Sequence, residues 1–157
     1  MTDVSFLPSY IGVGVDIVNI HRVERIISEN GMKFLNRIFT KKEIECFFNK
    51  YQKYVRKGFI FTIDSDELSG RNVIIDIASY IAKRFAAKES YSKALGCGIC
   101  VHLKFKDMEI LQNERGAPFW SSSTKFTEEF HTSLSMSDQY PFAMANTTLI
   151  RRREVAT

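Results

Sequence analysis

The feature that most constrains the fold is an alternation near the amino terminus. Branched apolar residues stand at every second position, at Ile11, Val13, Val15 and Ile17, with Gly12, Gly14 and Asp16 between them. Period-two alternation predicts a strand over 10–20. Glycines weaken a strand, so they usually mark a close approach of another part of the chain. We therefore expect a packing partner near the glycines, on the face that ends in the Asp16 carboxylate.

Helical spacing dominates the first two thirds of the chain. Ile77, Ile81 and Phe85 predict a long helix over 77–95, with Gly96 as its carboxyl-terminal cap. Earlier patterns predict a helix from residue 20 that ends at Asn30-Gly31, a short helical segment over 34–39, and a helix that begins with a capping box over 40–43. These helices come before most of the predicted strands.

Strand patterns dominate the last third. We predict strand pieces over 99–105 and 108–111, then a helix over 124–130, and then two closing strands over 132–135 and 142–150. We interpret residues 54–75 as a surface excursion within one domain that spans 1–157. The predicted fold class is α+β, with one antiparallel sheet packed on a long helix.

Composition and charge limit the classes of function. No window approaches the roughly 20 apolar residues of a membrane span, and residues 1–10 do not resemble a secretory signal. The three cysteines favour reduced thiols in a cytoplasm. Residues 1–60 hold 10 Lys and Arg against 6 Asp and Glu, which accounts for the whole net charge of +4. This excess fits an acidic partner, and a solvated helix surface explains it equally well.

Two carboxylates have contexts that suit chemistry. Asp16 ends a glycine-rich apolar strand, and Glu89 lies on the long helix with Lys93 one turn away. Two carboxylates without a set of His or Cys ligands favour Mg²⁺ over Zn²⁺. Arg84, Lys88 and Lys93 could neutralise substrate phosphates. A plain surface pair between Glu89 and Lys93, and a helix cap at Asp16, explain the same spacing.

Two other motifs give weaker evidence of function. Gly12-Val13-Gly14 lacks the third glycine of a dinucleotide-binding loop, because Ile17 stands there. Cys97 and Cys100 form a C-x-x-C without a second pair or a flanking Trp or Pro, which favours a coincidence over redox chemistry.

Five blocks in order resemble motifs of the holo-[acyl-carrier-protein] synthases, a family of 4′-phosphopantetheinyl transferases. The blocks lie at 11–24, 37–43, 84–99, 113–118 and 133–145. The third, which runs from Arg84 through Lys88-Glu89 and Lys93 to Gly96, resembles the signature helix of the family and is the most specific. The fourth has the form N-x-x-G-x-P.

The resemblance implies the fold of that family, usually as a cytoplasmic homotrimer, and its reaction. The phosphopantetheine arm of coenzyme A would pass to a serine of apo-acyl carrier protein, in fatty acid biosynthesis, with release of adenosine 3′,5′-bisphosphate. Asp16 and Glu89 match the Mg²⁺ ligands, and Glu89 and Lys93 would be catalytic. The proton acceptor would be Glu89 or a metal-bound water. The positions that match coenzyme A contacts are Arg84, Lys88, Lys93 and Gly96.

The resemblance also extends to the contact with the carrier protein, and the sequence departs from the family pattern at Met136. Arg22 matches a position that holds the acidic carrier, and we extend that role to Arg25, three residues on. Met136 replaces a histidine of many relatives, so any role of that histidine is not carried over. Two alternatives stay open: a basic module that binds nucleic acid without needing Asp16 or Glu89, and a homologue that keeps the fold without catalysis.

Overall fold

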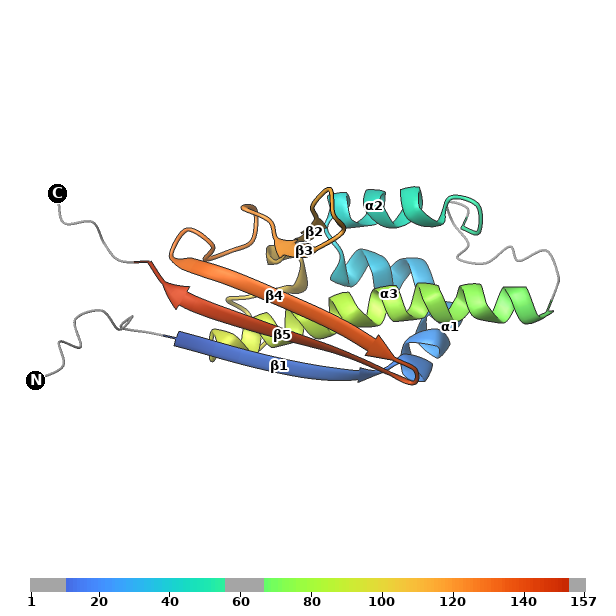
Figure 1. Ribbon diagram of the computed structural model, residues 1–157, viewed down its shortest axis with the longest axis horizontal. Helices are drawn as coiled ribbons and strands as arrows, with labels where there is room; N and C mark the ends of the chain where they lie inside the picture. Colours follow the sequence, from blue (N-terminus) through green and yellow to red (C-terminus); the bar gives the residue numbers. More distant parts are fainter. Residues whose placement is uncertain (1–10, 56–66, 153–157) are drawn as a thin grey trace, which may run out of the picture.

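The long helix α3 (Glu67–Ala94) forms the centre of the molecule, and the other large elements pack against it (Figure 1). The computed structural model describes residues 11–55 and 67–152. In chain order the remaining elements are β1 (Ile11–Asn19), α1 (Ile20–Ile38), α2 (Lys41–Tyr51), a 3₁₀ helix (Phe105–Asp107), β2 (Ile110–Gln112), β3 (Pro118–Trp120), β4 (Phe130–Gln139) and β5 (Phe142–Arg151).

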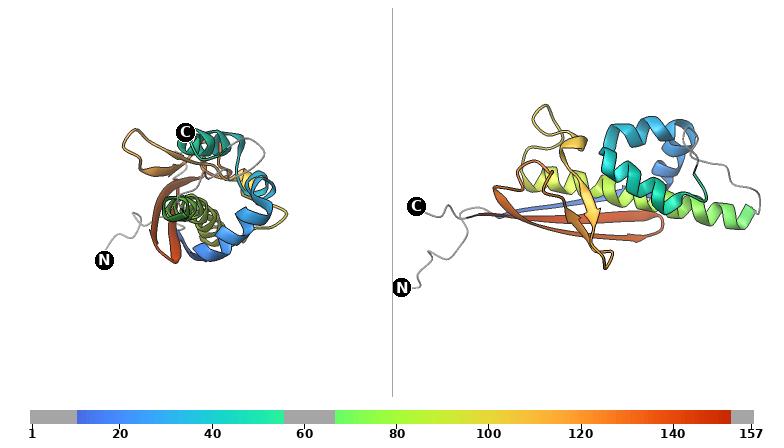
Figure 2. Two further views of the ribbon diagram at one scale, coloured as in Figure 1. Left: turned by 90° about the vertical axis from the view of Figure 1, so that its right-hand side faces the viewer. Right: turned by 90° about the horizontal axis from the view of Figure 1, so that it is seen from above.

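The main sheet is antiparallel, with the strand order β1-β5-β4. The sheet curves around one side of α3, while α1 and α2 cover the other side (Figure 2). β2 and β3 form a separate two-stranded antiparallel sheet. The predicted α+β fold, with an antiparallel sheet packed on a long helix, is therefore confirmed. No helix among the described residues is both long and apolar enough to cross a membrane.

The core consists of two clusters along α3. Ile77 and Ile81 contribute to a cluster that includes buried side chains of α1 and α2, such as Phe47. Further along the helix, Tyr91 packs in a second cluster with side chains from the small sheet and the main sheet, such as Trp120. α3 is therefore buried by different neighbours along its length.

The glycine face of β1 packs directly on α3, as the alternation predicted. Gly14 is buried, and a Cβ built on it would lie 1.9 Å from the backbone oxygen of Ser90 and 2.6 Å from the backbone nitrogen of Ala94. Any side chain at Gly14 would therefore force the strand and the helix apart. The opposite face of β1 carries the apolar residues, and Val13 and Ile17 are 62% and 63% exposed.

We expect Gly14→Ala to destabilise the protein by about 1–3 kcal/mol, because the added methyl group meets backbone atoms that cannot rotate away. The displaced strand should also carry Asp16 away from α3. Denaturant unfolding measures the stability, and Ser133→Ala, at an exposed position of β4, is the control. A Gly14→Ala protein as stable as this control would contradict the close packing.

Two predicted boundaries on the helical side are wrong. α3 begins at Glu67, so residues 67–75 are helical and do not belong to a surface excursion. Val73 packs against the core there, and this burial outweighs the low helix propensity of Gly70. The predicted helix end at Asn30-Gly31 is instead a kink: Asn30 has φ −143° and ψ 31°, and α1 continues to Ile38. Residues 56–66 lie outside the described part of the chain.

The predicted helix over 124–130 is also wrong. The chain forms turns there, and Phe126 has a φ of 70°, in the left-handed region that a right-handed helix cannot contain. The predicted strand over 99–105 reduces to an isolated bridge between Cys100 and Leu103. The capping box at the start of α2 is confirmed, since Thr40 and Glu43 exchange both of its hydrogen bonds.

Candidate active site

Asp16 and Lys93 meet where the end of β1 crosses α3. Lys93 Nζ donates a hydrogen bond to Asp16 Oδ1 at 2.8 Å and another to the backbone oxygen of Val15 at 3.1 Å. The Asp16 side chain is only 16% exposed, whereas that of Lys93 is 51% exposed. The close packing at Gly14, two residues earlier, holds this end of the strand against the helix.

Glu89 belongs to the same group. Partial burial raises the pKa of the Glu89 carboxyl, the Asp16 charge raises it further, and the Lys93 charge lowers it. The Asp16 carboxylate is therefore close enough for its charge to act on the Glu89 carboxyl. One lysine does not balance two carboxylates, so the cluster carries a net negative charge and favours a further cation.

The cluster has the donor set of a hard divalent cation. Asp16 and Glu89 supply carboxylate oxygens, and the positive charge of Lys93 pairs with the Asp16 carboxylate. Within 11–55 and 67–152 no group of three or more His, Cys, Asp or Glu side chains could hold a metal. Mg²⁺ fits this limit, since it commonly takes one or two protein carboxylates and completes its shell with phosphate oxygens and water.

Arg84 lies five residues before Glu89 on α3. It lines a cavity of about 330 Å³. The Arg84 side chain is almost fully buried, and its guanidinium carbon lies 3.4 Å from the centre of the Tyr80 ring. Its Nε has no hydrogen-bond partner within the described residues. The cavity wall also contains Lys42 from α2 and the chain over 110–112. A buried guanidinium with an unused donor is suited to bind an anion.

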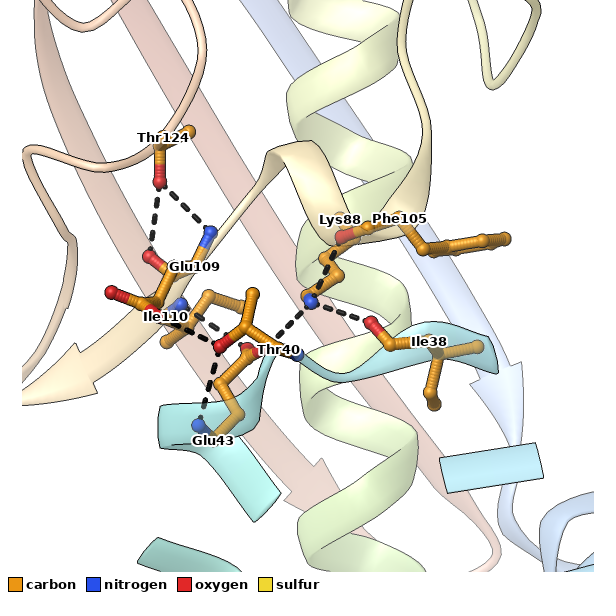
Figure 3. Close-up of polar contacts among 8 residues, drawn as sticks. All are labelled: Ile38, Thr40, Glu43, Lys88, Phe105, Glu109, Ile110 and Thr124. Atoms are coloured by element: carbon orange, nitrogen blue, oxygen red, sulfur yellow. Dashed lines mark hydrogen bonds and ion pairs between the residues drawn. The ribbon is translucent and has the colours of Figure 1, made fainter. Parts of the chain in front are cut away.

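Lys88 does not reach this site, although it was predicted to contact coenzyme A. Its side chain is fully buried, and Nζ donates to the backbone oxygen of Ile38 (2.6 Å), to Glu43 Oε2 (2.6 Å) and to the backbone oxygen of Phe105 (3.0 Å) (Figure 3). An ammonium has three N–H donors, so none remains for a phosphate. This correction removes Lys88 from the candidate site and gives it a structural role.

Glu43, which accepts the hydrogen bond from Lys88, also binds residues of other elements. Glu43 Oε2 also accepts from the backbone nitrogen of Thr40 (2.8 Å), and Oε1 accepts from the backbone nitrogen of Ile110 (3.2 Å). Thr40 Oγ1 donates to Glu109 Oε2 at 2.7 Å. The pair therefore fixes the start of α2 and strand β2, which form two walls of the cavity, on α3. Sequence reasoning identified Glu43 only as a capping residue and missed this role.

The remaining predicted residues lie around these groups. Arg22 and Arg25 are exposed on the first turns of α1, directly after β1. Gly96 ends α3 with a φ of 73°, and a Cβ built on it would meet no atom within 4 Å. Met136 faces inward and packs against the second core cluster. Lys42 was missed as a residue of the anion site, although it lies within the basic segment that the charge count had identified.

Comparisons with known proteins show the family to which the chain belongs. Residues 12–145 match the model of the 4′-phosphopantetheinyl transferase superfamily. A holo-[acyl-carrier-protein] synthase of Wolbachia pipientis (strain wPip) is 40% identical over 135 residues, which cover 85% of this chain and 92% of that protein. The enzyme of the same name from Anoxybacillus flavithermus is 37% identical over 133 residues, which cover 85% and 91%.

Solved structures of the same family have a similar fold. The Bacillus anthracis holo-(acyl-carrier-protein) synthase in complex with CoA (3′,5′-ADP) has a TM-score of 0.64 and 31% identity, with 90% of this chain and 96% of that chain covered. The Helicobacter pylori enzyme in complex with coenzyme A has a TM-score of 0.64 and 30% identity, with 87% and 98% covered. The chain therefore belongs to the 4′-phosphopantetheinyl transferase superfamily, as an enzyme of the holo-[acyl-carrier-protein] synthase family.

Proposed function

We propose that the protein transfers the 4′-phosphopantetheine arm of coenzyme A to a serine of apo-acyl carrier protein and releases adenosine 3′,5′-bisphosphate. The observation that carries this proposal is the convergence of Asp16, Glu89 and Lys93 where β1 crosses α3. The serine oxygen would form a bond to the phosphorus next to the pantetheine, and the pyrophosphate bond would break. We further propose that the single transferase domain 1–157 acts in the cytoplasm, where the modified carrier supports fatty acid biosynthesis.

The roles follow from the charges. Asp16 and Glu89 would hold Mg²⁺, which when bound supplies positive charge to the pyrophosphate oxygens. Once a metal occupies the carboxylates, the half-exposed Lys93 ammonium is available to the phosphates of the departing product. We assign proton acceptance to Glu89 or to a metal-bound water, the two groups at this centre that could take the proton of the serine.

Coenzyme A carries a second anionic group, the 3′-phosphate of its adenosine. We assign this end to the cavity beside Arg84 and Lys42, whose charges and unused Nε donor suit a phosphate. Arg84 and Glu89 are five residues apart on α3, about 7.5 Å along its axis and roughly 140° around it, so the pantetheine end would have to pass around the helix to reach Asp16 and Glu89. Gly96 would form the rim of the site, just beyond Lys93.

The carrier would dock on the first turns of α1. Arg22 and Arg25 are exposed, and residues three apart lie on the same side of a helix. Together they present two positive charges directly after the strand that supplies Asp16. An acidic carrier bound there would bring its serine toward the transfer centre, and this explains part of the basic excess in residues 1–60.

The outer face of the sheet supports a homotrimer. Seven large apolar side chains stand exposed there: Ile11, Val13, Val15 and Ile17 on β1, and Phe142, Met144 and Ile150 on β5. The register places them on one side, with Ile17 opposite Met144 and Ile11 opposite Ile150. Contiguous exposed apolar patches mark association surfaces. We propose that three copies bury this face against one another.

Val13→Asp should convert the trimer to a monomer, because burying an unpaired carboxylate in an apolar interface is costly. Light scattering coupled to size exclusion measures the mass. Val101→Asp is the control, since Val101 is 84% exposed and lies after α3, outside the strands of the sheet. A monomeric wild-type protein, or a trimeric Val13→Asp protein, would refute this interface.

The reaction itself is tested by intact mass spectrometry of apo-acyl carrier protein incubated with the protein, coenzyme A and Mg²⁺. We expect the carrier to gain the mass of one phosphopantetheine arm and adenosine 3′,5′-bisphosphate to accumulate in equal amount. An unchanged carrier mass with folded protein would overturn the proposed function. Omission of coenzyme A is the control.

A further inference from the structure

Cys46 lines the cavity beside Arg84 and has no part in the proposed reaction. It lies on α2 as a free, exposed thiol. Lys42, Cys46 and Asn49 are spaced i, i+4 and i+7 along α2, so they share the face of the helix that forms the cavity wall. A thiol in this position is reachable from solvent and faces the same space as the anion site.

A second observation concerns a buried charged residue in the wall of this cavity. The Arg84 residue is 3% exposed and its Nε has no partner within the described residues. One terminal nitrogen makes only a long hydrogen bond of 3.4 Å to the backbone oxygen of Tyr80. A buried donor without a partner costs free energy unless a ligand satisfies it. The Cys46 thiol is close enough for its charge to act on the pKa of Arg84 and of Tyr80.

We propose that Cys46 is a covalent modification site for small anionic disulfides, and that its adduct closes the cavity to coenzyme A. The Cys46 thiol loses its proton to water, and the thiolate attacks one sulfur of the disulfide. The disulfide bond breaks, a new bond joins Cys46 Sγ to that sulfur, and the other half leaves as a thiolate that takes up a proton. A second thiol reverses the step by the same exchange.

The charges around Cys46 select the anion. Lys42 and Arg84 contribute two positive charges to the cavity wall and Glu45 contributes one negative charge. A carboxylate or phosphate of the disulfide can therefore pair with Arg84 while its sulfur reaches Cys46. A neutral disulfide lacks this anchor. The second part of the inference, closure to coenzyme A, rests on the proposed function, whereas the modification itself does not.

Cys97 and Cys100 provide controls within the same molecule. Both are free and exposed like Cys46, but they follow α3 at its far end and do not line the cavity. Cys97 Sγ contacts the backbone oxygen of Ser92 at 3.9 Å. Burial and the neighbouring Cys100 raise the pKa of the Cys97 thiol. A raised pKa leaves less reactive thiolate at Cys97, so Cys100 is the comparison for Cys46, and a neutral disulfide measures the preference that does not depend on charge.

The test follows modification of the full chain by peptide mass spectrometry, with glutathione disulfide as the anionic probe and bis(2-hydroxyethyl) disulfide as the neutral one. Glutathione should attach to Cys46 in preference to Cys100, and this preference should be several-fold smaller with the neutral disulfide. Adenosine 3′,5′-bisphosphate at about ten times its measured dissociation constant should slow the reaction at Cys46 about tenfold and leave the other two cysteines unchanged.

Transferase rates test the consequence, each as a fraction of the same variant's untreated rate. The Cys97→Ser/Cys100→Ser protein, which keeps Cys46, should lose activity with glutathione disulfide and regain it with dithiothreitol, whereas Cys46→Ser should resist. Equal attachment of both probes at Cys46 would overturn the modification site. Bound adenosine 3′,5′-bisphosphate that leaves Cys46 unprotected would overturn the closure. A protein that modifies no carrier yet shows selective attachment would refute the proposed function alone.

Discussion

Asp16→Asn and Glu89→Gln are each expected to slow modification of apo-acyl carrier protein about a hundredfold or more while the protein stays folded. Each variant removes one of the two negative charges that would hold Mg²⁺ and leaves the size of the side chain unchanged. Metal stabilisation of transferring phosphate is worth several kcal/mol, and about 2.7 kcal/mol corresponds to a hundredfold in rate. The measurement is the initial rate of carrier modification at saturating coenzyme A.

Glu114→Gln is the matched control for these variants. Glu114 is exposed in the turn between β2 and β3, so its loss of charge should leave the rate unchanged. Circular dichroism and thermal unfolding establish that each variant is folded. A folded Asp16→Asn or Glu89→Gln protein with the wild-type rate would remove that residue from the transfer centre.

Lys88→Met is expected to destabilise the protein by about 3–5 kcal/mol, because it leaves the buried carboxylate of Glu43 without its cation. The substitution shortens the unbranched side chain by one atom and removes all three hydrogen bonds to Ile38, Glu43 and Phe105. Denaturant unfolding at pH 7 measures the loss. The Lys88→Met/Glu43→Gln double variant should recover part of it, since no unpaired charge then remains buried.

Lys83→Met is the control on the same helix. Lys83 pairs with Asp138, but both side chains are about one third exposed, and such pairs contribute roughly 0–1 kcal/mol. A loss of stability in Lys88→Met no larger than in Lys83→Met would contradict the structural role of Lys88. The comparison also separates this role from a contact with coenzyme A, which would affect the rate and not the stability.

Local patterns predicted the elements whose structure is decided locally. The capping box of Thr40 and Glu43 needs only neighbouring residues, and it forms as expected. The glycines of β1 indicated a close approach, and the partner proved to be the backbone of α3 at Ser90 and Ala94. The pairing of strands and the position of Asp16 beside Lys93 follow from that contact.

Features decided by tertiary contacts were missed. Asn30-Gly31 has the composition of a helix end, but Gly31 and Leu35 are buried, and packing carries the chain on as a kinked helix. The left-handed conformation of Phe126 has no signal in a sequence that otherwise favours a helix. At Asn30 the local preference was correct in kind, and burial of Gly31 and Leu35 determined the outcome.

In the candidate site as well, local spacing predicted some features and tertiary contacts decided the others. Spacing along one helix correctly suggested that Glu89 and Lys93 belong together, and the structure adds Asp16 to them. Spacing could not distinguish Lys88 from Arg84, because both are basic residues of the same motif. Only the structure shows that Lys88 points into the Glu43 network while Arg84 faces a cavity with an unused donor.

The rate of carrier modification as a function of free Mg²⁺, for the wild type and for Glu89→Gln, tests the central claim most directly. The claim is that Asp16 and Glu89 form a metal-assisted transfer centre. We predict that the wild-type rate vanishes with a chelator, returns and saturates as Mg²⁺ is added, and that Glu89→Gln needs a higher Mg²⁺ concentration to reach a lower maximum. A full wild-type rate in the chelator, or identical Mg²⁺ curves for the two proteins, would contradict the claim.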